Sequence, residues 1–244
     1  MESISDRVLL DVWDSAICHS LLEKSLLLIS KCFPSRSFNE VACLTIGERD
    51  ACLFKIRKQL FGSELHNVTT CPQCRQRIEW QTSVDSLCRQ GLDLIWEIKP
   101  LEIIYKGQQV RFRIPNSTDI LEIMKIENPD FRQRVLVERC LENASLPSSS
   151  TEGWPEDLME AVIEKIEACD PLADITLDIN CPDCGHRWTS CFDIMWFLWS
   201  EIDMWAKKLV QDVSVLAVNF GWSEHDILGM SHNRRNLYIN QIYE

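Results

Sequence analysis

The chain has 244 residues, of which 45% are hydrophobic and 25% are charged, with only 8 glycines and 9 prolines. This composition is ordinary for a folded protein and excludes disordered, collagen-like and low-complexity chains. The formal net charge is −12, and residues 116–244 hold 10 Lys and Arg against 23 Asp and Glu. A nucleic-acid-binding protein needs a basic surface that neutralises phosphates. The charge therefore favours a protein partner with a basic or mixed surface.

The cysteines and the apolar runs indicate the compartment. No charge-free apolar stretch reaches the roughly 18 residues that a membrane span needs. The N-terminal sequence MESISDRVLLDVWD has no basic flank before its short apolar run, unlike a signal peptide. Many of the 12 cysteines stand alone along predicted helices, as in a reducing cytosol, where a free thiol acts as a small buried hydrophobe. We expect a cytoplasmic protein without a membrane span.

The N-terminal segment is predicted to be helical. A dense apolar run over residues 9–33 predicts one helix, and TIGERDACLFKIRKQLFG predicts a second. Thr45 is a suitable N-cap, and Glu48 three residues later completes a capping box. Gly62 is well placed to end this helix.

Strand-forming residues surround two short cysteine motifs. NVTT and RIEWQTSV flank Cys71-Pro-Gln-Cys74, and ITLDIN precedes Cys181-Pro-Asp-Cys184. Each motif is therefore predicted to be a tight knuckle between two strands. A third pair of strands is expected over residues 96–114, on either side of the turn pair Lys106-Gly107.

The rest of the chain is predicted to be mainly helical. Short helices are expected after Ser117-Thr118 and from Asn128-Pro129, and an acidic helix from Pro155 to about Cys169. The longest helix is expected from residue 194, followed by two short ones. Residues 143–153, NASLPSSSTEG, form a plain linker.

These elements predict an α+β fold that is mainly helical, with a small antiparallel zinc ribbon built from the two distant CPxC knuckles and a β-hairpin. We expect one compact unit made of the following segments: a helical segment 1–64, the ribbon 65–90 plus 174–193, an inserted hairpin with acidic helices 91–173, and a helical segment 194–244.

The two CPxC motifs predict a single structural zinc site. A CxxC turn directs two sulfurs at one point, and two such turns supply the four thiolates of a closed tetrahedral site. The predicted ligands are Cys71, Cys74, Cys181 and Cys184. Two alternatives remain, namely unrelated buried thiols and a redox dithiol, although thioredoxin-like motifs lead into a helix and these lead into strands.

Charged residues beside the knuckles suit this site. Four thiolates and one Zn²⁺ carry a net charge of −2, which Arg75, Arg77 and Arg187 are predicted to offset from outside the ligand shell. The second knuckle continues with Gly185, whereas the first has Arg75 at the same position. A residue other than glycine is strained in the left-handed backbone conformation that such a turn requires.

No catalytic motif accompanies the cysteines. The sequence has no nucleophile elbow, Walker loop, dinucleotide fingerprint or H-E-x-x-H motif, and a closed four-thiolate site has no open position for water. We therefore expect no enzymatic activity and no small-molecule substrate. The long C-terminal helix is apolar nearly all round, which indicates deep burial or a partner surface. Trp196 and Trp199 are the candidate partner-binding residues on it.

Several stretches together resemble a known family. They are LTIGERDACLFKIRKQLFG before TTCPQC, then VRFRIPNSTD, DPLADITLDINCPDCGHRW, FDIMWFLWSEID and FGWSEHDILGMSHNRRNLYI. In this order they resemble the zinc-knuckle family of T4-type phage baseplate proteins and baseplate hub assembly chaperones, which occurs in contractile phage tails and phage-tail-like injection systems. The resemblance runs from about Leu10 to Tyr238.

This resemblance implies a non-enzymatic role in building the baseplate, with baseplate, hub or spike proteins as partners. The family's cysteine positions match the four knuckle cysteines, and Arg75 departs from the family's usual glycine. The rival hypotheses are a zinc-ribbon nucleic-acid-binding module and a CxxC thiol oxidoreductase. The acidic charge argues against the first rival, and the strands after both motifs argue against the second.

Overall fold

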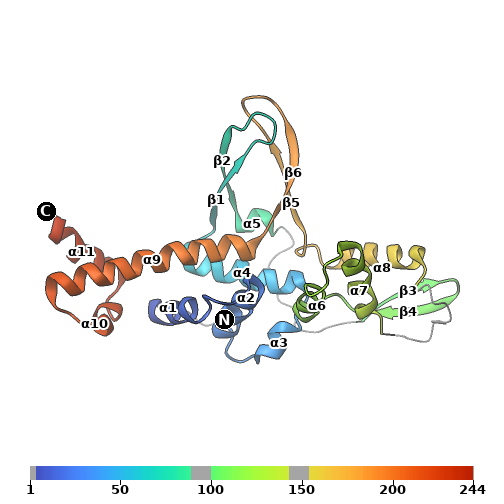
Figure 1. Cartoon of the computed structure of the whole chain (residues 1–244), viewed down its shortest axis with the longest axis horizontal. Coiled ribbons are helices and arrows are strands. Elements are labelled where there is room, and N and C mark those ends of the chain that lie inside the picture. Colours follow the sequence, from blue (N-terminus) through green and yellow to red (C-terminus); the bar gives the residue numbers. More distant parts are fainter. Residues whose placement is uncertain (1–3, 89–99, 143–153, 244) are drawn as a thin grey trace. The chain divides into compact units, whose positions relative to one another are not determined.

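The computed structural model describes residues 4–88, 100–142 and 154–243. They form a mainly helical fold with small antiparallel strand pairs (Figure 1), which confirms the predicted fold class. Within these ranges, none of the helices combines the length with the apolar content that crossing a membrane requires. The linker predicted at 143–153 and the start of the predicted hairpin strand at 96–99 lie outside the described residues.

The chain divides into two compact units, where the sequence led us to expect one. The first unit combines Met1–Ser35 with Met195–Glu244, and the second is Arg36–Ile194. The four sequence segments proposed above remain a prediction about how the chain is organised.

The first unit consists of helices from both ends of the chain. Residues 9–33 were expected to form a single helix, but the structure breaks it into two. The second of these has a capping box, because the Ser20 side chain accepts the Glu23 backbone N–H while the Glu23 carboxylate accepts the Ser20 N–H. The helices of this unit are α1 (Asp6–Ser15), α2 (Leu21–Cys32), α9 (Ile194–Phe220), α10 (Glu224–Leu228) and α11 (His232–Tyr243).

The long helix α9 has a buried apolar stripe along one side. Leu198, Ile202, Leu209 and Leu216 are buried, whereas Phe220 at the end of the helix is 38% exposed. Several apolar side chains off the stripe are exposed, namely Trp196, Met204, Val210 and Val218. The helix therefore carries apolar groups that its own unit does not cover.

The second unit begins with a short helix that was not predicted, α3 (Phe38–Ala42), and continues with α4 (Ile46–Phe61). Helix α4 has the expected capping box between Thr45 and Glu48, and it ends at Gly62 with a positive φ of 85°. Its buried residues include Phe54, which stacks on Phe192 with ring centroids 6.0 Å apart.

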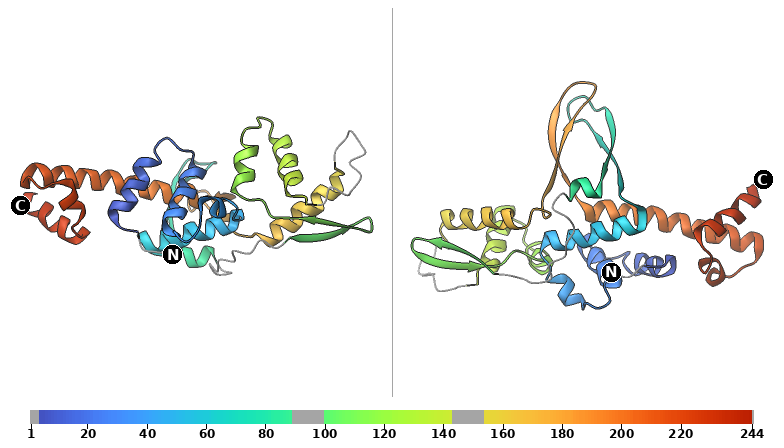
Figure 2. Two further views of the ribbon diagram at one scale, coloured as in Figure 1. Left: turned by 90° about the horizontal axis from the view of Figure 1, so that it is seen from below. Right: turned by 180° about the vertical axis from the view of Figure 1, so that it is seen from behind.

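Three two-stranded antiparallel sheets lie in the described part of the second unit. Two of them carry the cysteine motifs at their tips and lie side by side in Figure 1 and in the right-hand view of Figure 2. The third turns at Lys106 and Gly107, both with positive φ, as the sequence predicted. The strand pairs are β1 (Glu64–Thr70) with β2 (Arg77–Ser83), β3 (Leu101–Tyr105) with β4 (Gln108–Phe112), and β5 (Ile175–Asn180) with β6 (Arg187–Phe192).

Two of the remaining helices of this unit, α7 (Pro129–Cys140) and α8 (Glu156–Cys169), pack on the β3–β4 hairpin. Val110, Phe112, Val137 and Leu158 are buried together in one apolar cluster. The helices in the unit are α5 (Val84–Leu87), α6 (Ser117–Ile123), α7 (Pro129–Cys140) and α8 (Glu156–Cys169). Helix α7 starts at Pro129 as predicted.

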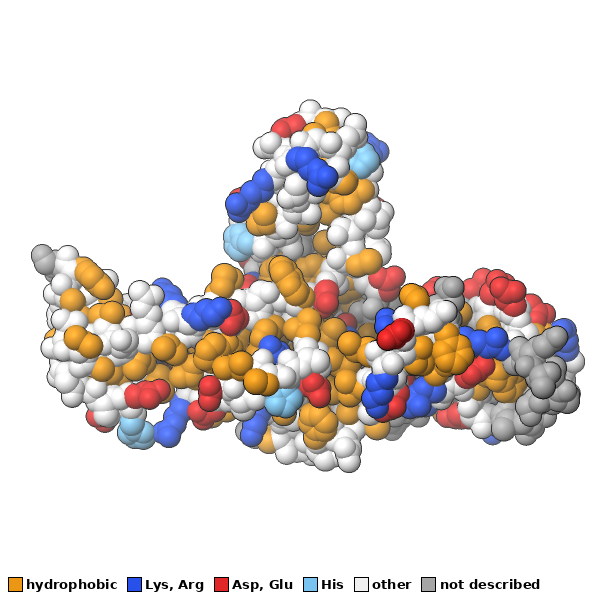
Figure 3. Space-filling model, viewed as in Figure 1, with side chains coloured by type: hydrophobic (Ala, Val, Ile, Leu, Met, Phe, Trp, Pro, Cys, Tyr) orange, Lys and Arg blue, Asp and Glu red, His pale blue; other side chains and the backbone are white. Residues whose placement is uncertain are grey.

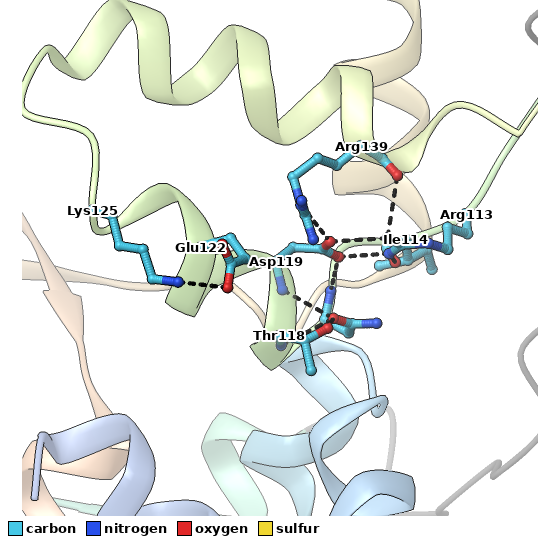
Figure 4. A network of polar contacts seen from close by, with 8 residues as sticks. Arg113, Ile114, Thr118, Asp119, Glu122, Lys125 and Arg139 are labelled. Carbon is cyan, nitrogen blue, oxygen red and sulfur yellow. Dashed lines mark hydrogen bonds and ion pairs between the residues drawn. The ribbon is translucent and has the colours of Figure 1, made fainter.

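The start of α6 corrects one prediction and contains a buried ion-pair network. Asn116 caps the helix, because its side chain accepts the backbone N–H of Asp119, whereas Ser117 and Thr118 had been expected to do so. The carboxylate of Asp119 is fully buried and accepts hydrogen bonds from Arg113 at 2.6 and 2.9 Å and from Arg139 at 3.0 Å (Figure 4). The Asn116 backbone N–H adds a fourth, at 3.1 Å.

Two distant sequence motifs meet at the start of α4. The Asp170 carboxylate accepts the Gly47 backbone N–H at 3.0 Å and the Thr45 hydroxyl at 3.2 Å. A negative charge is favourable at this helix end, because the first backbone N–H groups have no helical acceptor. The GERD and DPLAD stretches are therefore joined by a buried tertiary contact.

We expect Gly47→Ala to lower the free energy of unfolding by about 1–3 kcal/mol, the usual range when atoms are forced into filled space. The added Cβ would lie 2.1 Å from Asp170 Oδ1 and 3.2 Å from the Ala173 backbone nitrogen. Urea unfolding measures the effect. Gly229→Ala is the matched control, since its Cβ would meet only carbonyl oxygens at 3.4 Å. Equal unfolding midpoints for both variants and the unchanged protein would contradict the predicted clash.

Candidate metal centre

The tips of the two knuckle hairpins bring together the sulfurs of Cys71, Cys74, Cys181 and Cys184. All four Sγ atoms lie within 4.8 Å of one another. Cys71 Sγ is 3.7 Å from Cys184 Sγ, and Cys74 Sγ is 3.6 Å from Cys181 Sγ. Four sulfurs about 2.3 Å from one metal ion in a regular tetrahedron would be about 3.8 Å apart. The four thiols are therefore spaced as ligands of a single ion would be.

The backbone of the two knuckles is nearly identical. In the first, the Arg75 N–H donates to the Cys71 carbonyl at 3.0 Å, and in the second the Gly185 N–H donates to the Cys181 carbonyl at 3.0 Å. Arg75 has a φ of 66° and Gly185 a φ of 72°. The left-handed turn expected at this position is present in both copies. Arg75 adopts it despite its Cβ, which costs about 1–2 kcal/mol.

The sulfurs influence one another's protonation. Burial raises the pKa of the Cys71 thiol, but the backbone N–H groups of Cys74 and Gln73 and the neighbouring thiols bring it down to about 7. At Cys74 the Gln76 N–H lowers the pKa, while burial and the three other sulfurs raise it to about 12. Ionisation of one thiol therefore disfavours ionisation of its neighbours. A bound cation would remove this competition and hold all four as thiolates.

Apolar groups cover one side of the cysteine cluster. Cys71 and Cys181, the first cysteine of each knuckle, are buried with Ile78, and Trp80 and Trp188 pack against them. These two tryptophans were not predicted as part of the site, although each lies on the strand that follows a knuckle. Cys74 and Cys184 are exposed. The cluster is therefore half enclosed.

Two of the three arginines predicted to offset the thiolate charge, Arg77 and Arg187, occupy equivalent positions, whereas Arg75 lies in the turn of the first knuckle. Arg77 pairs with Thr70 and Arg187 pairs with Asn180 in the strand register, so both stand at the closing end of a knuckle. Arg77 is exposed and forms an ion pair with Glu79 at 2.7 Å. Within the described ranges, no hydrogen bond joins these guanidinium groups to a cluster sulfur. Their charge-compensating role stays a prediction.

The candidate partner-binding residues lie on α9 of the first unit, whereas the cysteine cluster belongs to the second unit. Trp196 is 63% exposed. Trp199 is half-buried, and the Lys24 ammonium lies 5.1 Å from the centre of its ring. The structure thus separates two residues that the sequence analysis had treated alike.

The chemistry of the donor set fits a metal ion. Four sulfur donors in a tetrahedral arrangement are typical of zinc or iron–sulfur sites, and four protein ligands leave no position for a substrate or a water molecule. The arrangement suits a structural role, because one metal ion bound by all four sulfurs would link two distant hairpins. Cys74 in the first hairpin and Cys181 in the second are 107 positions apart in the sequence.

Comparison with protein families gives a match that spans both knuckles. Residues 19–199, more than half of the chain, match the family described as T4 bacteriophage base plate protein. The chain belongs to this family. The T4 base plate match includes both knuckles, the α4 motif and Trp196, and it ends inside α9. It confirms the family resemblance read from the sequence. Comparisons with curated proteins and with solved structures gave no match.

Proposed function

We propose that this protein is a non-enzymatic, zinc-stapled assembly factor or structural component of the baseplate hub of a contractile phage tail or phage-tail-like injection system. The observation that carries this proposal is the four-sulfur cluster inside the region matched to the base plate family. Membership of the base plate family supports a role in the baseplate. A metal ion bound by the four-sulfur cluster would hold a small binding module rigid. We further propose that the protein folds in the cytoplasm and then joins the assembling particle.

The proposed metal ion is one structural Zn²⁺ bound by Cys71, Cys74, Cys181 and Cys184. Zn²⁺ favours four thiolates in a tetrahedron and needs no redox partner. The thiols of the unfolded chain are protonated and scattered, so the free energy of metal binding becomes free energy of folding. The ion would join the β1–β2 and β5–β6 hairpins, which share no strand pairing in the described structure.

The rival functions have less support. A nucleic-acid-binding ribbon would need a basic surface, and the chain carries a net charge of −12. A thiol oxidoreductase would place its CxxC motif at the start of a helix, but each knuckle leads into a strand, β2 or β6. Neither rival accounts for the family match.

The exposed side of α9 is the proposed contact with other baseplate proteins. Trp196, Met204 and Val218 are each more than half exposed on it. Aromatic anchors surrounded by smaller contacts contribute most of the binding energy at protein interfaces. Trp196 is a better anchor than Trp199, because Trp196 is 63% exposed and Trp199 is half-buried.

We expect co-expression with the neighbouring hub and baseplate proteins to give a stable complex that Trp196→Glu disrupts, weakening it at least tenfold. A charge at this exposed position should leave the fold and the metal content unchanged. Affinity purification followed by metal analysis of the complex tests this.

Ile104→Glu is the matched control, since Ile104 is 74% exposed on the other unit of the chain. Loss of metal in the Trp196 variant would show that the side chain has a structural role instead. If the unchanged protein associates with none of these proteins, and particles assemble without its gene, the assembly role is wrong.

A further inference from the structure

A groove lies between α7 and α8, in the second unit and away from the cysteine cluster. Its volume is about 610 Å³, which is the size of a site that takes several side chains. The apolar lining comes from Val137 of α7, from Met159 and Ile163 of α8, and from Trp154 just before α8. Val137 and Met159 belong to the buried cluster below, so the floor of the groove is rigid core. The two helices and the hairpin beside them are seen in both views of Figure 2.

Carboxylates line the α8 side of this groove. Glu156 and Glu160 border it, and Glu164 continues the same row at four-residue spacing. Figure 3 shows acidic side chains gathered over α8. On the α7 side, Arg134 already forms an ion pair with Glu138 at 3.1 Å. The charge offered to a ligand in the groove is therefore negative.

The described part of the chain does not neutralise the row of carboxylates on α8. Among the described residues, no ion pair or hydrogen bond engages the side chains of Glu156, Glu160 or Glu164. Like charges four residues apart on a helix repel each other and destabilise it by a few tenths of a kcal/mol per pair. A positively charged side chain of a ligand, placed along the rim, would reduce this repulsion and would be attracted by the carboxylates.

We propose that the α7–α8 groove binds a helix of another baseplate protein whose apolar side chains are flanked by Lys or Arg. The partner's apolar side chains contact the apolar floor of the groove, and its Lys or Arg residues are attracted by the glutamates of the rim. This inference rests on the proposed baseplate role, because that role defines where the partner is sought. It adds a second contact surface, separate from the exposed side of α9.

The lining of the groove suits the apolar face of a helical partner. It runs from Gln133 to Val137 along α7 and from Glu156 to Ile163 along α8, which is about one turn and about two turns of helix. A third helix laid between two packed helices inserts its side-chain ridges into the groove, and this is a common mode of peptide recognition. Phosphate-bearing ligands such as nucleic acids or anionic lipid surfaces would be repelled by Glu156 and Glu160.

The test uses the purified, metal-loaded full-length protein. Peptides of about 20 residues, long enough to span the groove as a helix, would tile the baseplate proteins encoded beside its gene. Binding is measured by fluorescence anisotropy. We expect binding only by peptides that combine Leu, Ile, Met or aromatic residues with Lys or Arg. Glu160→Lys should weaken that binding at least tenfold, and so should Gln133→Trp, which fills the groove without changing its charge.

Asp11→Lys on the exposed side of α1 is the matched control, because it makes the same charge change on the other unit. It should leave peptide binding unchanged. Peptides that bind the Glu160 and Gln133 variants as tightly as the unchanged protein would overturn the groove proposal. If full-length baseplate proteins bind but no peptide does, the groove proposal also falls, whereas the proposed function stands. If no full-length protein binds, both fall.

Discussion

Cys181→Ser is expected to remove the metal and to lower the free energy of unfolding by several kcal/mol. The purified protein should hold one zinc ion per chain, because the four Sγ atoms converge on one point. Removing one thiolate opens the tetrahedron, and metal-binding energy is folding energy in such sites. The loss should be large here because the ion links Cys74 and Cys181 across 107 positions of chain. Elemental analysis and urea unfolding with and without a chelator measure both effects.

Cys191→Ser is the matched control for this experiment. Cys191 is an exposed thiol on β6, the strand that follows the second knuckle, and it lies outside the four-sulfur cluster. Its replacement should leave one zinc per chain and an unchanged unfolding midpoint. A metal content of zero or two in the unchanged protein would overturn the single-site proposal. So would a Cys181 variant that keeps its zinc.

Asp119→Asn is expected to lower the free energy of unfolding by about 3 kcal/mol at pH 7. Removing one partner of a buried ion pair leaves the other charge without compensation, which typically costs about 3–5 kcal/mol. The lower end applies because the side chains of Arg113 and Arg139 are 24% and 39% exposed, whereas that of Asp119 is 0% exposed. Glu122→Gln is the control on the same helix, because the Glu122–Lys125 pair is exposed and should contribute less than about 1 kcal/mol.

The effect of Asp119→Asn should depend on pH in a defined direction. Burial alone would raise the pKa of Asp119, but the Arg113 guanidinium, the Asn116 N–H and Arg139 outweigh it and hold the pKa below its ordinary value. A carboxylate with a lowered pKa in the folded state stabilises the protein above the unfolded-state pKa of about 3.9. This contribution is lost as the pH falls through the folded-state pKa. The stability difference between the two proteins should therefore shrink below about pH 4, and a constant difference would contradict this assignment.

Local features of the chain could be predicted from the sequence because they depend on residues a few positions apart. The capping box of Thr45 and Glu48, the turn at Lys106 and Gly107, and the strands around both knuckles were all expected and are present. The cysteine spacing within each knuckle likewise predicted that two sulfurs would point the same way. One local signal was overlooked, the capping box at Ser20 that separates α1 from α2.

The tertiary structure decided which of these local features come together. Nothing within a few residues of Asp119 or Asp170 indicates that the first is fully buried between two arginines, or that the second binds the start of α4. The sequence also treated Trp196 and Trp199 alike, since a helix that is apolar all round has no periodicity to show which side is covered. In the structure Trp196 is 63% exposed, whereas Trp199 is half-buried and has the ammonium of Lys24, far away in the sequence, 5.1 Å from its ring centre. The two knuckles, the cysteines in them and the family could thus be predicted from the sequence alone. Only the fold decided which buried charges are paired and which apolar groups face solvent, because those depend on contacts between distant segments.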